Sequence, residues 1–600
     1  MALTEEPKTI EVPSANGAGG TFTLQYKNRF LYSKYNPQKN ILAAIQSLEI
    51  LPGTLVLAFS PCLFYGWNEL QEKCKATGSE ILCVEADAAL HAFSKKTAQD
   101  QKLAATLLPL DQNTPRGLDA FFCASPKKFR RVLRVDFSAG VSFAPEFYKI
   151  FFECAQNIVA AFWKNRLTLV RLGRLYCKNI FKNLIMAASA LPFEALERTV
   201  EKPILVCGAG ESLDELTQNA AALAAINERF FILAVDAALP ALLDAGIKID
   251  AVAATESQLA IEKAYIGLGA RAQNGVKTKN AAADENCLQD QKTAAPAPFF
   301  FFDLTSRAQI VRRVCADNDA SQGQNCGAAA CFYFSEFDKN AFVGRLSSSG
   351  LLPEQAPPLG SVGLTATYLA LRLRKSESVP VYVLGLDFSF SAGKTHARGT
   401  AQSKALFLQA SRLRPAQNYA AAYGLASEKL IGKNGAATWT TKNLLGYAAL
   451  FRDYFKGAKN LCDAGKSGVD LGIKRRPLAD ILDEPPLGPA KNSRRADSNA
   501  CGLSNNSGKV QNARRFLADE LKALRALADL LSNGEAAAAR DASLSLDEQI
   551  RAALEGREYL YLHFPDGAEP SLDKSFLTRV RAQIDFFCKD IETALAAAQS

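Results

Sequence analysis

The stretch Pro203-Ile-Leu-Val-Cys-Gly-Ala-Gly-Glu-Ser-Leu-Asp214 decides the predicted fold of the chain. Its first five residues form an apolar run that predicts a buried strand. Gly208 and Gly210 then permit a tight turn and a close approach of the backbone to a ligand, and a helix is expected from about Glu215. Free N–H groups at a helix start can bind a phosphate or a carboxylate, and Ser212 can cap the helix or bind that anion.

Two more strands follow at the spacing of an α/β domain. The run Phe230–Val235 leads to Asp236, and the run Ile249–Ala254 leads to Thr255 and Glu256. Strands that alternate with helices predict a parallel sheet, and open sheets of this kind bind ligands at the carboxyl edge, where these polar side chains are expected. The Gly-x-Gly turn by itself fits a nucleotide site and ordinary turn glycines equally well, so both interpretations stay open.

Length and composition limit the class of protein. The 600 residues predict three or four structural units, and 48% hydrophobic with 22% charged residues is typical of a soluble globular protein. The sequence has no apolar run near the roughly 20 residues that span a bilayer and no signal-peptide pattern at its start, so a cytoplasmic protein without a membrane span is expected. The net charge of +9 is modest, and no nucleic-acid partner is expected. The 14 cysteines include no C-x-x-C pair, which favours reduced thiols and predicts no metal site.

The N-terminal part predicts a smaller α/β domain. We expect a flexible arm at residues 1–20 and a Rossmann-like domain at residues 21–140, which opens with the strands Thr54–Phe59 and Glu80–Glu85. The turn after the first strand, Ala58-Phe-Ser-Pro-Cys62, has no glycine where a backbone must approach a cofactor. A structural or docking domain is therefore favoured over a cofactor site.

A helical connector is predicted at residues 141–200. Five basic side chains in it share one helical face, because they are spaced by seven, three, four and four residues. These are Lys164, Arg171, Arg174, Lys178 and Lys182. A solvated surface is the favoured interpretation, and a rim that attracts an anionic donor is the alternative. Asn179 and Asn183 lie in the same segment, and the sequence explains neither.

The stretch Pro358–Thr400 carries the second group of polar residues. Gly360-Ser361-Val-Gly363 precedes a helix, so Ser361 is expected at a second N-terminus that can bind an anion. A further strand, Pro380–Gly385, comes next. The polar residues that follow this strand include Asp387, Lys394, His396 and Arg398. A histidine near a carboxylate and flanked by Lys and Arg suits proton transfer beside an anionic substrate, and an exposed surface histidine is the alternative.

Composition also divides the rest of the chain. We expect a central domain at residues 201–476 with a polar insertion at 269–298, a linker at 477–509, and a helical C-terminal domain at 510–600. The predicted fold class is therefore α/β, with a central Rossmann-like parallel sheet, a smaller α/β N-terminal domain and a helical C-terminal domain.

The order of the motifs resembles the motility-associated factor (Maf) glycosyltransferases of flagellated bacteria, whose central domain is also called MptE-like after archaeal hydroxymethylpterin pyrophosphokinases. The resemblance covers roughly residues 21–477 and depends on the order of the motifs more than on any one of them. The motifs are Cys-Gly-Ala-Gly-Glu-Ser-Leu-Asp, Ala-Val-Asp-Ala-Ala-Leu-Pro, Ala-Thr-Glu-Ser-Gln, Gly-Ser-Val-Gly, and Leu-Gly-Leu-Asp-Phe-Ser-Phe with Gly-Lys-Thr-His-Ala.

This resemblance implies a sialyltransferase-like central domain that transfers a nonulosonic acid, of the pseudaminic or legionaminic type, from a CMP-activated donor to Ser or Thr of flagellin. The implied partner is flagellin, alone or with its chaperone. The residues implied to hold the donor are Gly208, Gly210, Ser212 and Ser361 at the phosphate or sugar carboxylate, and Asp236, Thr255 and Glu256 at the cytidine ribose. Asp387 and His396 are the implied candidates for the base. Lys394 or Arg398 would stabilise the departing CMP, so the chemistry requires no metal and no cofactor.

Two departures from the family pattern bear on the identity of the substrate. Glu256 stands where the family usually has Asp, and Leu386 replaces a usual Gln before Asp387. Two other functions stay open. The first is an MptE-like pterin pyrophosphokinase that uses ATP and Mg²⁺, and the second is a non-catalytic factor that binds flagellin.

Overall fold

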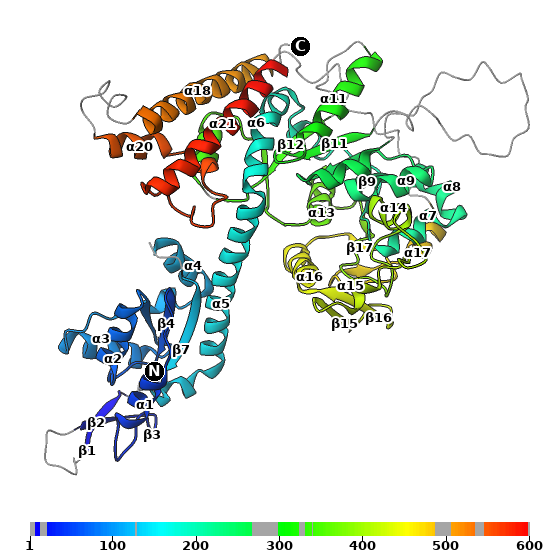
Figure 1. Cartoon of the computed structure of the whole chain (residues 1–600). Helices are drawn as coiled ribbons and strands as arrows, with labels where there is room; N and C mark the ends of the chain where they lie inside the picture. The colour runs from blue at the N-terminus through cyan, green and yellow to red at the C-terminus, as the bar shows by residue number, and fades with distance from the viewer. Residues whose placement is uncertain are drawn as a thin grey trace, which may run out of the picture. The chain divides into compact units, whose positions relative to one another are not determined.

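The computed structural model describes residues 6–12, 21–125, 129–266, 298–322, 330–338, 340–485, 506–533 and 545–597. The chain forms two compact units, Met1–Thr168 and Leu169–Ser600 (Figure 1). Nearly all of the predicted insertion at 269–298, and residues 486–505 of the predicted linker, lie outside the described residues. Within the part that the structure describes, no helix combines the length and the hydropathy needed to cross a membrane.

The first unit contains a parallel four-stranded sheet and a small antiparallel sheet. Strand order in the parallel sheet is β6-β5-β4-β7, and every residue of β4 is buried, as its continuous apolar sequence predicts. Strand β1 pairs with β2, so part of the arm predicted as flexible is a paired strand. The elements are β1 (Lys8–Val12), β2 (Thr21–Tyr26), β3 (Arg29–Phe30), α1 (Lys39–Ser47), β4 (Thr54–Phe59), α2 (Trp67–Ala76), β5 (Glu80–Val84), α3 (Ala88–Asp100), β6 (Thr106–Leu107), α4 (Pro115–Ala124), β7 (Arg131–Asp136) and α5 (Pro145–Thr168).

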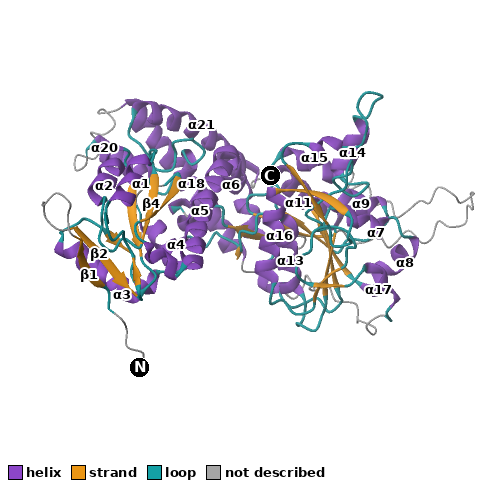
Figure 2. Cartoon of the chain, turned by 90° about the horizontal axis from the view of Figure 1, so that it is seen from below, coloured by secondary structure: helices purple, strands orange, loops and turns teal. Residues whose placement is uncertain are grey.

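The second unit is built on a nine-stranded sheet in which every pair of neighbours is parallel. Helices flank its strands (Figure 2). Its strands are β8 (Ile204–Cys207), β9 (Phe231–Val235), β10 (Ala251–Ala254), β11 (Phe299–Asp303), β12 (Ala330–Ser335), β13 (Glu354–Ala356), β14 (Val381–Leu384), β17 (Leu461–Asp463) and β18 (Lys474–Arg475). The strands β8 to β11 and β14 are almost wholly buried, which fits their apolar sequences. The predicted α/β fold class is confirmed.

The order of the strands creates a switch point beside β8. Strands β9 to β13 are added one after another on one side of β8, and helix α13 (Val362–Leu373) then carries the chain back to β14 on the other side. Helix α13 packs on β8, β9, β10 and β14. The carboxyl ends of β8 and β14 therefore meet where the strand order reverses, which is where open α/β sheets bind ligands.

The helix predicted from about Glu215 begins at Asp214 but is short. The chain forms a 3₁₀ turn (Glu211–Leu213), the one-turn helix α7 (Asp214–Thr217) and then a separate helix α8 (Ala220–Arg229). The Asn219 side chain accepts a hydrogen bond from the backbone N–H of Ala222 and so starts α8 as a separate helix. No long helix therefore points its positive end at the turn after β8.

Helix α6 (Arg174–Ser189) links the sheet to a helical layer. It packs against α18 (Asn506–Asn533) and α21 (Lys574–Ala597), and these helices lie together in Figure 1. A π-helical turn at Leu169–Gly173 precedes α6. The shorter helices of this unit are α9 (Leu239–Asp244), α11 (Ala308–Gln322), α12 (Ala341–Ser348), α14 (Ala401–Leu408), α15 (Tyr419–Tyr423), α16 (Lys442–Phe455), α17 (Leu478–Asp483) and α20 (Leu546–Leu554).

Two buried asparagines of α6 hold it against the carboxyl edge of the sheet. Asn183 Nδ2 donates to the carbonyl oxygens of Leu304 and Ser306 at 3.0 and 2.8 Å. Asn179 Nδ2 donates to the carbonyl oxygen of Thr305 at 2.9 Å. These asparagines, which the sequence left unexplained, pair buried backbone carbonyls that would otherwise lose their hydrogen bonds to water.

We expect Asn183→Ala to destabilise the second unit by about 2 to 4 kcal/mol, because it leaves two buried carbonyls without a donor. The urea midpoint of the full chain, followed by circular dichroism, measures this effect. Asn443→Ala is the matched control, since Asn443 is an exposed asparagine on α16, and a change within about 0.5 kcal/mol is expected. Equal midpoints for the two variants would contradict the role of Asn183.

Candidate functional site

The turn after β8 and the turn after β14 touch through their backbones at the switch point. The N–H of Gly208 donates to the Leu384 carbonyl at 2.7 Å, and the N–H of Gly210 donates to the Gly385 carbonyl at 2.8 Å. A Cβ atom on Gly210 would lie 2.6 Å from that same Gly385 oxygen. The two glycines therefore allow one stretch of backbone to approach another, and both N–H groups predicted to face the donor phosphate have acceptors within the protein.

Ser212 and Asp387 join the same two turns through their side chains. Ser212 donates its backbone N–H to Asp387 Oδ2 at 2.8 Å and its hydroxyl to Asp387 Oδ1 at 2.5 Å. The Ser212 hydroxyl also accepts the N–H of Gly385 at 2.9 Å. Both side chains are buried, and burial raises the pKa of Asp387 to about 6. Ser212, predicted to cap a helix or to bind the donor, is thus hydrogen-bonded to Asp387, one of the two candidate bases.

A buried lysine and a second buried aspartate lie beside this pair. Lys433, in the turn between β15 (Ser427–Ile431) and β16 (Ala437–Thr441), places Nζ 2.5 Å from Asp463 Oδ2. Their side chains are only 2% and 3% exposed. Burial raises the pKa of Asp463, and the charge of Lys433 opposes that rise, as it does at Asp387. One ammonium group thus offsets the charge of two buried carboxylates.

The His396 loop, which we define as residues 391–399, is fastened to the turn after β8. Asp214 Oδ2 lies 2.6 Å from Lys394 Nζ, and Asp214 Oδ1 accepts the backbone N–H of Arg398 at 2.9 Å. Lys394 Nζ also lies 3.5 Å from a carboxylate oxygen of Glu211. Lys394 is therefore neutralised by protein carboxylates, whereas the Arg398 side chain is exposed.

His396 is held next to the glycine turn and keeps one ring nitrogen available. The following N–H, of Ala397, donates to the Ala209 carbonyl at 3.0 Å. His396 Nδ1 lies 3.0 Å from the Thr395 hydroxyl, and among the described residues its Nε2 has no hydrogen-bond partner in the structure. Burial lowers the pKa of His396, so the imidazole is neutral at pH 7 and can accept a proton.

The start of α13 approaches the same place. Ser361 is the N-cap residue, and its side chain makes no capping hydrogen bond. A Cβ atom added to Gly363 would collide with Leu386, and one added to Gly208 would lie 2.6 Å from Leu386 Cδ2. The two predicted anion-binding turns therefore converge, with the Leu386 side chain between them as an apolar floor.

The predicted ribose-binding residues form a separate group at β9 and β10. Asp236 is buried and accepts the N–H of Ala237 at 2.8 Å, and the backbone N–H groups of Thr255 and Glu256 lower its pKa against the effect of burial. Its Oδ2 is buried and, within the described part of the chain, has no hydrogen-bond partner. Thr255 and Glu256 are half-buried. The structure thus joins these three to each other and not to the His396 loop.

Lys433 and Asp463 are site residues that sequence reasoning missed. Asp463 ends strand β17, so the strand-end rule that selected Asp236 and Asp387 could have found it. Lys433 lies in a hairpin turn, where the sequence carries no signal of its burial. Among the described residues, no group of three His, Cys, Asp or Glu side chains is arranged to hold a metal ion.

Comparison with known proteins adds to this geometry. Residues 177–270 match the family model described as 6-hydroxymethylpterin diphosphokinase MptE-like. An uncharacterized protein of Treponema pallidum (strain Nichols) is 31% identical over 599 residues, which cover 95% of this chain and 93% of that protein. The chain belongs to the family of this Treponema protein.

The fold itself is that of a Maf protein. The structure of the Maf glycosyltransferase from Magnetospirillum magneticum AMB-1 matches with a TM-score of 0.50 and 15% sequence identity, over 98% of this chain and 90% of that one. Together with the MptE-like match, this fold confirms the predicted resemblance to the Maf family with an MptE-like central domain. In this Maf-like chain, the MptE-like match contains most of α6 and all of β8, β9 and β10, and so includes the glycine turn.

We expect Asp236→Asn to stabilise this Maf-like chain increasingly as pH rises from about 4 to about 7, and by a constant amount above that. Burial raises the pKa of Asp236 from 3.8 to about 7. The protonated carboxyl group therefore stabilises the wild type fully below pH 3.8, and this stabilisation is lost as pH rises to 7. The difference in unfolding free energy between variant and wild type should grow by roughly 4 kcal/mol, measured by urea unfolding at several pH values.

Glu377→Gln is the control for that experiment, because its difference in unfolding free energy from the wild type should change with pH in the opposite direction. A hydrogen bond from Lys459 lowers the pKa of Glu377 below 4.5, so the wild type loses this stability as pH falls through the lowered pKa. The unfolding free energy of Glu377→Gln should therefore fall relative to that of the wild type as pH rises toward 4.5. A pH-independent difference for Asp236→Asn would refute the interpretation of the buried carboxyl group.

Proposed function

We propose that the chain is a glycosyltransferase that moves a nonulosonic acid, of the pseudaminic or legionaminic type, from its CMP-activated form to Ser or Thr hydroxyls of flagellin in the cytoplasm. The Maf fold and the MptE-like match support this assignment. The observation that carries it is the convergence of the glycine turn, the start of α13 and the His396 loop at the switch point of the sheet.

The donor phosphate belongs, in this proposal, at the start of α13. The first N–H groups of a helix have no acceptor within the helix, and α13 is 12 residues long. Ser361 adds a hydroxyl that is not used for capping, and the exposed side chain of Arg398 adds a positive charge on the neighbouring loop. Gly208, Gly210 and Ser212 shape this place through contacts with the turn after β14 and do not supply donors.

His396 is the proposed base. The acceptor hydroxyl oxygen bonds to the anomeric carbon of the sugar, the bond from that carbon to the phosphate oxygen breaks, and CMP leaves with the electron pair. The hydroxyl proton goes to the Nε2 of the neutral His396 ring. Asp387 is better suited to positioning, because it is buried and both of its oxygens accept hydrogen bonds from Ser212.

A pterin diphosphokinase is the second candidate, and the MptE-like match over residues 177–270 favours it. That reaction would use ATP with Mg²⁺ instead of a CMP-sugar. A third candidate, a non-catalytic factor that binds flagellin, would bind the donor without turning it over. The ligand and the product therefore separate the three functions.

Calorimetry with CMP and with ATP, each with and without Mg²⁺, distinguishes the first two functions. We expect CMP to bind without Mg²⁺, because the proposed contacts are a helix N-terminus, a hydroxyl and an arginine. Arg398→Gln should weaken CMP binding by about tenfold through loss of one charged contact, while Lys459→Gln, a change at an exposed surface lysine, should leave it unchanged. Binding of ATP with Mg²⁺ and none of CMP would favour the kinase.

We expect flagellin from cells that lack this protein to lose the mass of the sugar, as measured by intact mass spectrometry. With purified protein, His396→Ala should reduce kcat about 100-fold or more with little change in CMP affinity, because only the base is removed. His91→Ala, a half-buried histidine in the first unit, is the matched control and should keep full activity. Unchanged flagellin mass after deletion would reject the proposed function.

A further inference from the structure

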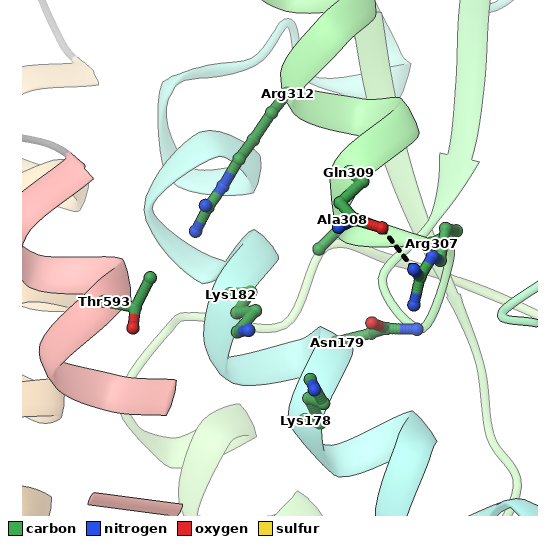
Figure 3. Close-up of a pocket in the computed structure, with 8 residues that line it drawn as sticks. All are labelled: Lys178, Asn179, Lys182, Arg307, Ala308, Gln309, Arg312 and Thr593. Carbon is green, nitrogen blue, oxygen red and sulfur yellow. Dashed lines mark hydrogen bonds between the residues drawn. The ribbon is translucent and has the colours of Figure 1, made fainter. Parts of the chain in front are cut away.

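A cavity lined by polar side chains lies between α6 and the start of α11. Its volume is about 300 Å³, and four basic side chains line it, namely Lys178, Lys182, Arg307 and Arg312. Figure 3 shows the lysines on α6, Arg312 on α11, and Thr593 facing them from α21. We call this cavity the α6–α11 pocket. It lies by the loops that follow β10 and β11, so it is at the carboxyl edge but two or three strands away from β8.

The charge in the α6–α11 pocket is only partly compensated. Lys182 Nζ lies 2.8 Å from Asp590 Oδ1, and Lys178 Nζ lies 4.0 Å from the same atom. Arg307 Nε pairs with Glu262 at 2.8 Å. Among the described residues, two carboxylates thus pair with three of the four cations of the pocket. Burial lowers the pKa of Lys178, and the nearby charges of Lys182 and Arg307 lower it further, against the effect of Asp590.

Arg312 contributes a donor that the protein itself does not use. Its Nη2 atom is buried and has no hydrogen-bond partner among the residues that the structure describes. A buried guanidinium nitrogen without an acceptor is costly, and an anion in the pocket would remove that cost. The start of α11, a 15-residue helix, adds partial positive charge to the same cavity through Ala308 and Gln309, which also line it.

The frame of the pocket is fixed by buried hydrogen bonds. Asn179, on the turn of α6 between the two lysines, donates to the Thr305 carbonyl at 2.9 Å, and the N–H of Arg307 donates to the Glu256 carbonyl at 3.1 Å. These bonds fasten α6 and the start of α11 to the ends of β10 and β11. The cations are therefore presented by a preformed site, which lowers the ordering cost of binding.

We infer that the α6–α11 pocket binds the phosphate group of a small phosphorylated molecule, at a site separate from the switch point. A guanidinium fork and ammonium groups around a helix N-terminus match the geometry of a phosphate group. A cavity of about 300 Å³ is at the lower end of the size of small-molecule sites. The inference does not depend on the proposed glycosyltransferase activity, because no residue of the pocket takes part in it.

Calorimetry with pyrophosphate and the full chain tests the site. We expect one pyrophosphate in the α6–α11 pocket of each chain, with an affinity that falls as NaCl is raised. Arg312→Gln should weaken binding at least about tenfold, because it removes one charged contact. It should not lower the melting temperature of the unliganded chain, since among the described residues Arg312 Nη2 has no partner to lose and its unpaired state is costly. Arg398→Gln, the matched arginine at the switch point, should bind pyrophosphate like the wild type.

The outcomes separate this site from the proposed active site. No binding of pyrophosphate, unchanged binding in Arg312→Gln, or an equal loss in Arg398→Gln would overturn the inference. A parallel titration with CMP distinguishes the source of the phosphate, because a loss of CMP binding in Arg312→Gln identifies a nucleotide as the occupant. Binding of pyrophosphate in this pocket, with CMP binding unchanged in Arg312→Gln, identifies a free phosphate or diphosphate as the occupant. His396→Ala should retain pyrophosphate binding even if the transferase activity proves absent.

Discussion

The pair Ser212 and Asp387 holds together the two turns that meet where the strand order reverses. Two hydrogen bonds from Ser212 to one carboxylate, and a third from the N–H of Gly385 to the Ser212 hydroxyl, connect the ends of β8 and β14. These strands are neighbours in the sheet although more than 170 residues separate them in the chain. The contact also requires Gly208 and Gly210, because a Cβ atom at either position would collide with the turn after β14.

Burial of charge at this place has a consequence for its chemistry. The carboxyl groups of Asp387 and Asp463 are both buried beside Lys433, and burial raises both pKa values. Isolated buried carboxylates are costly, so the hydrogen bonds and the lysine are needed to keep the cluster stable. The cluster thereby fixes backbone positions, while the more accessible polar groups, His396 and Arg398, lie on a loop fastened to it.

Much of this arrangement could be predicted from the sequence, and the remainder depends on distances that a sequence does not contain. Asp236, Glu256 and Asp387 follow apolar runs, and parallel strands all end at one edge, so their common location was predictable. That Asp387 turns inward to Ser212 depends on the contact between β8 and β14. The burial of Lys433 depends on how a hairpin folds back over that edge, and the roles of Asn179 and Asn183 depend on carbonyls more than 75 residues away.

The exposure and the pKa of each side chain bear on which predicted residues can contact a substrate. A group that transfers a proton must reach it, and a carboxyl group with 4% exposure and two hydrogen-bonded oxygens does not, even when its pKa of about 6 is suited to the task. The imidazole of His396, next to the same turn, is only half-buried, and burial lowers its pKa. The pKa and the accessibility of a side chain must therefore both fit before it is assigned as a base, and in this chain the two criteria together support the proposal of His396 over Asp387.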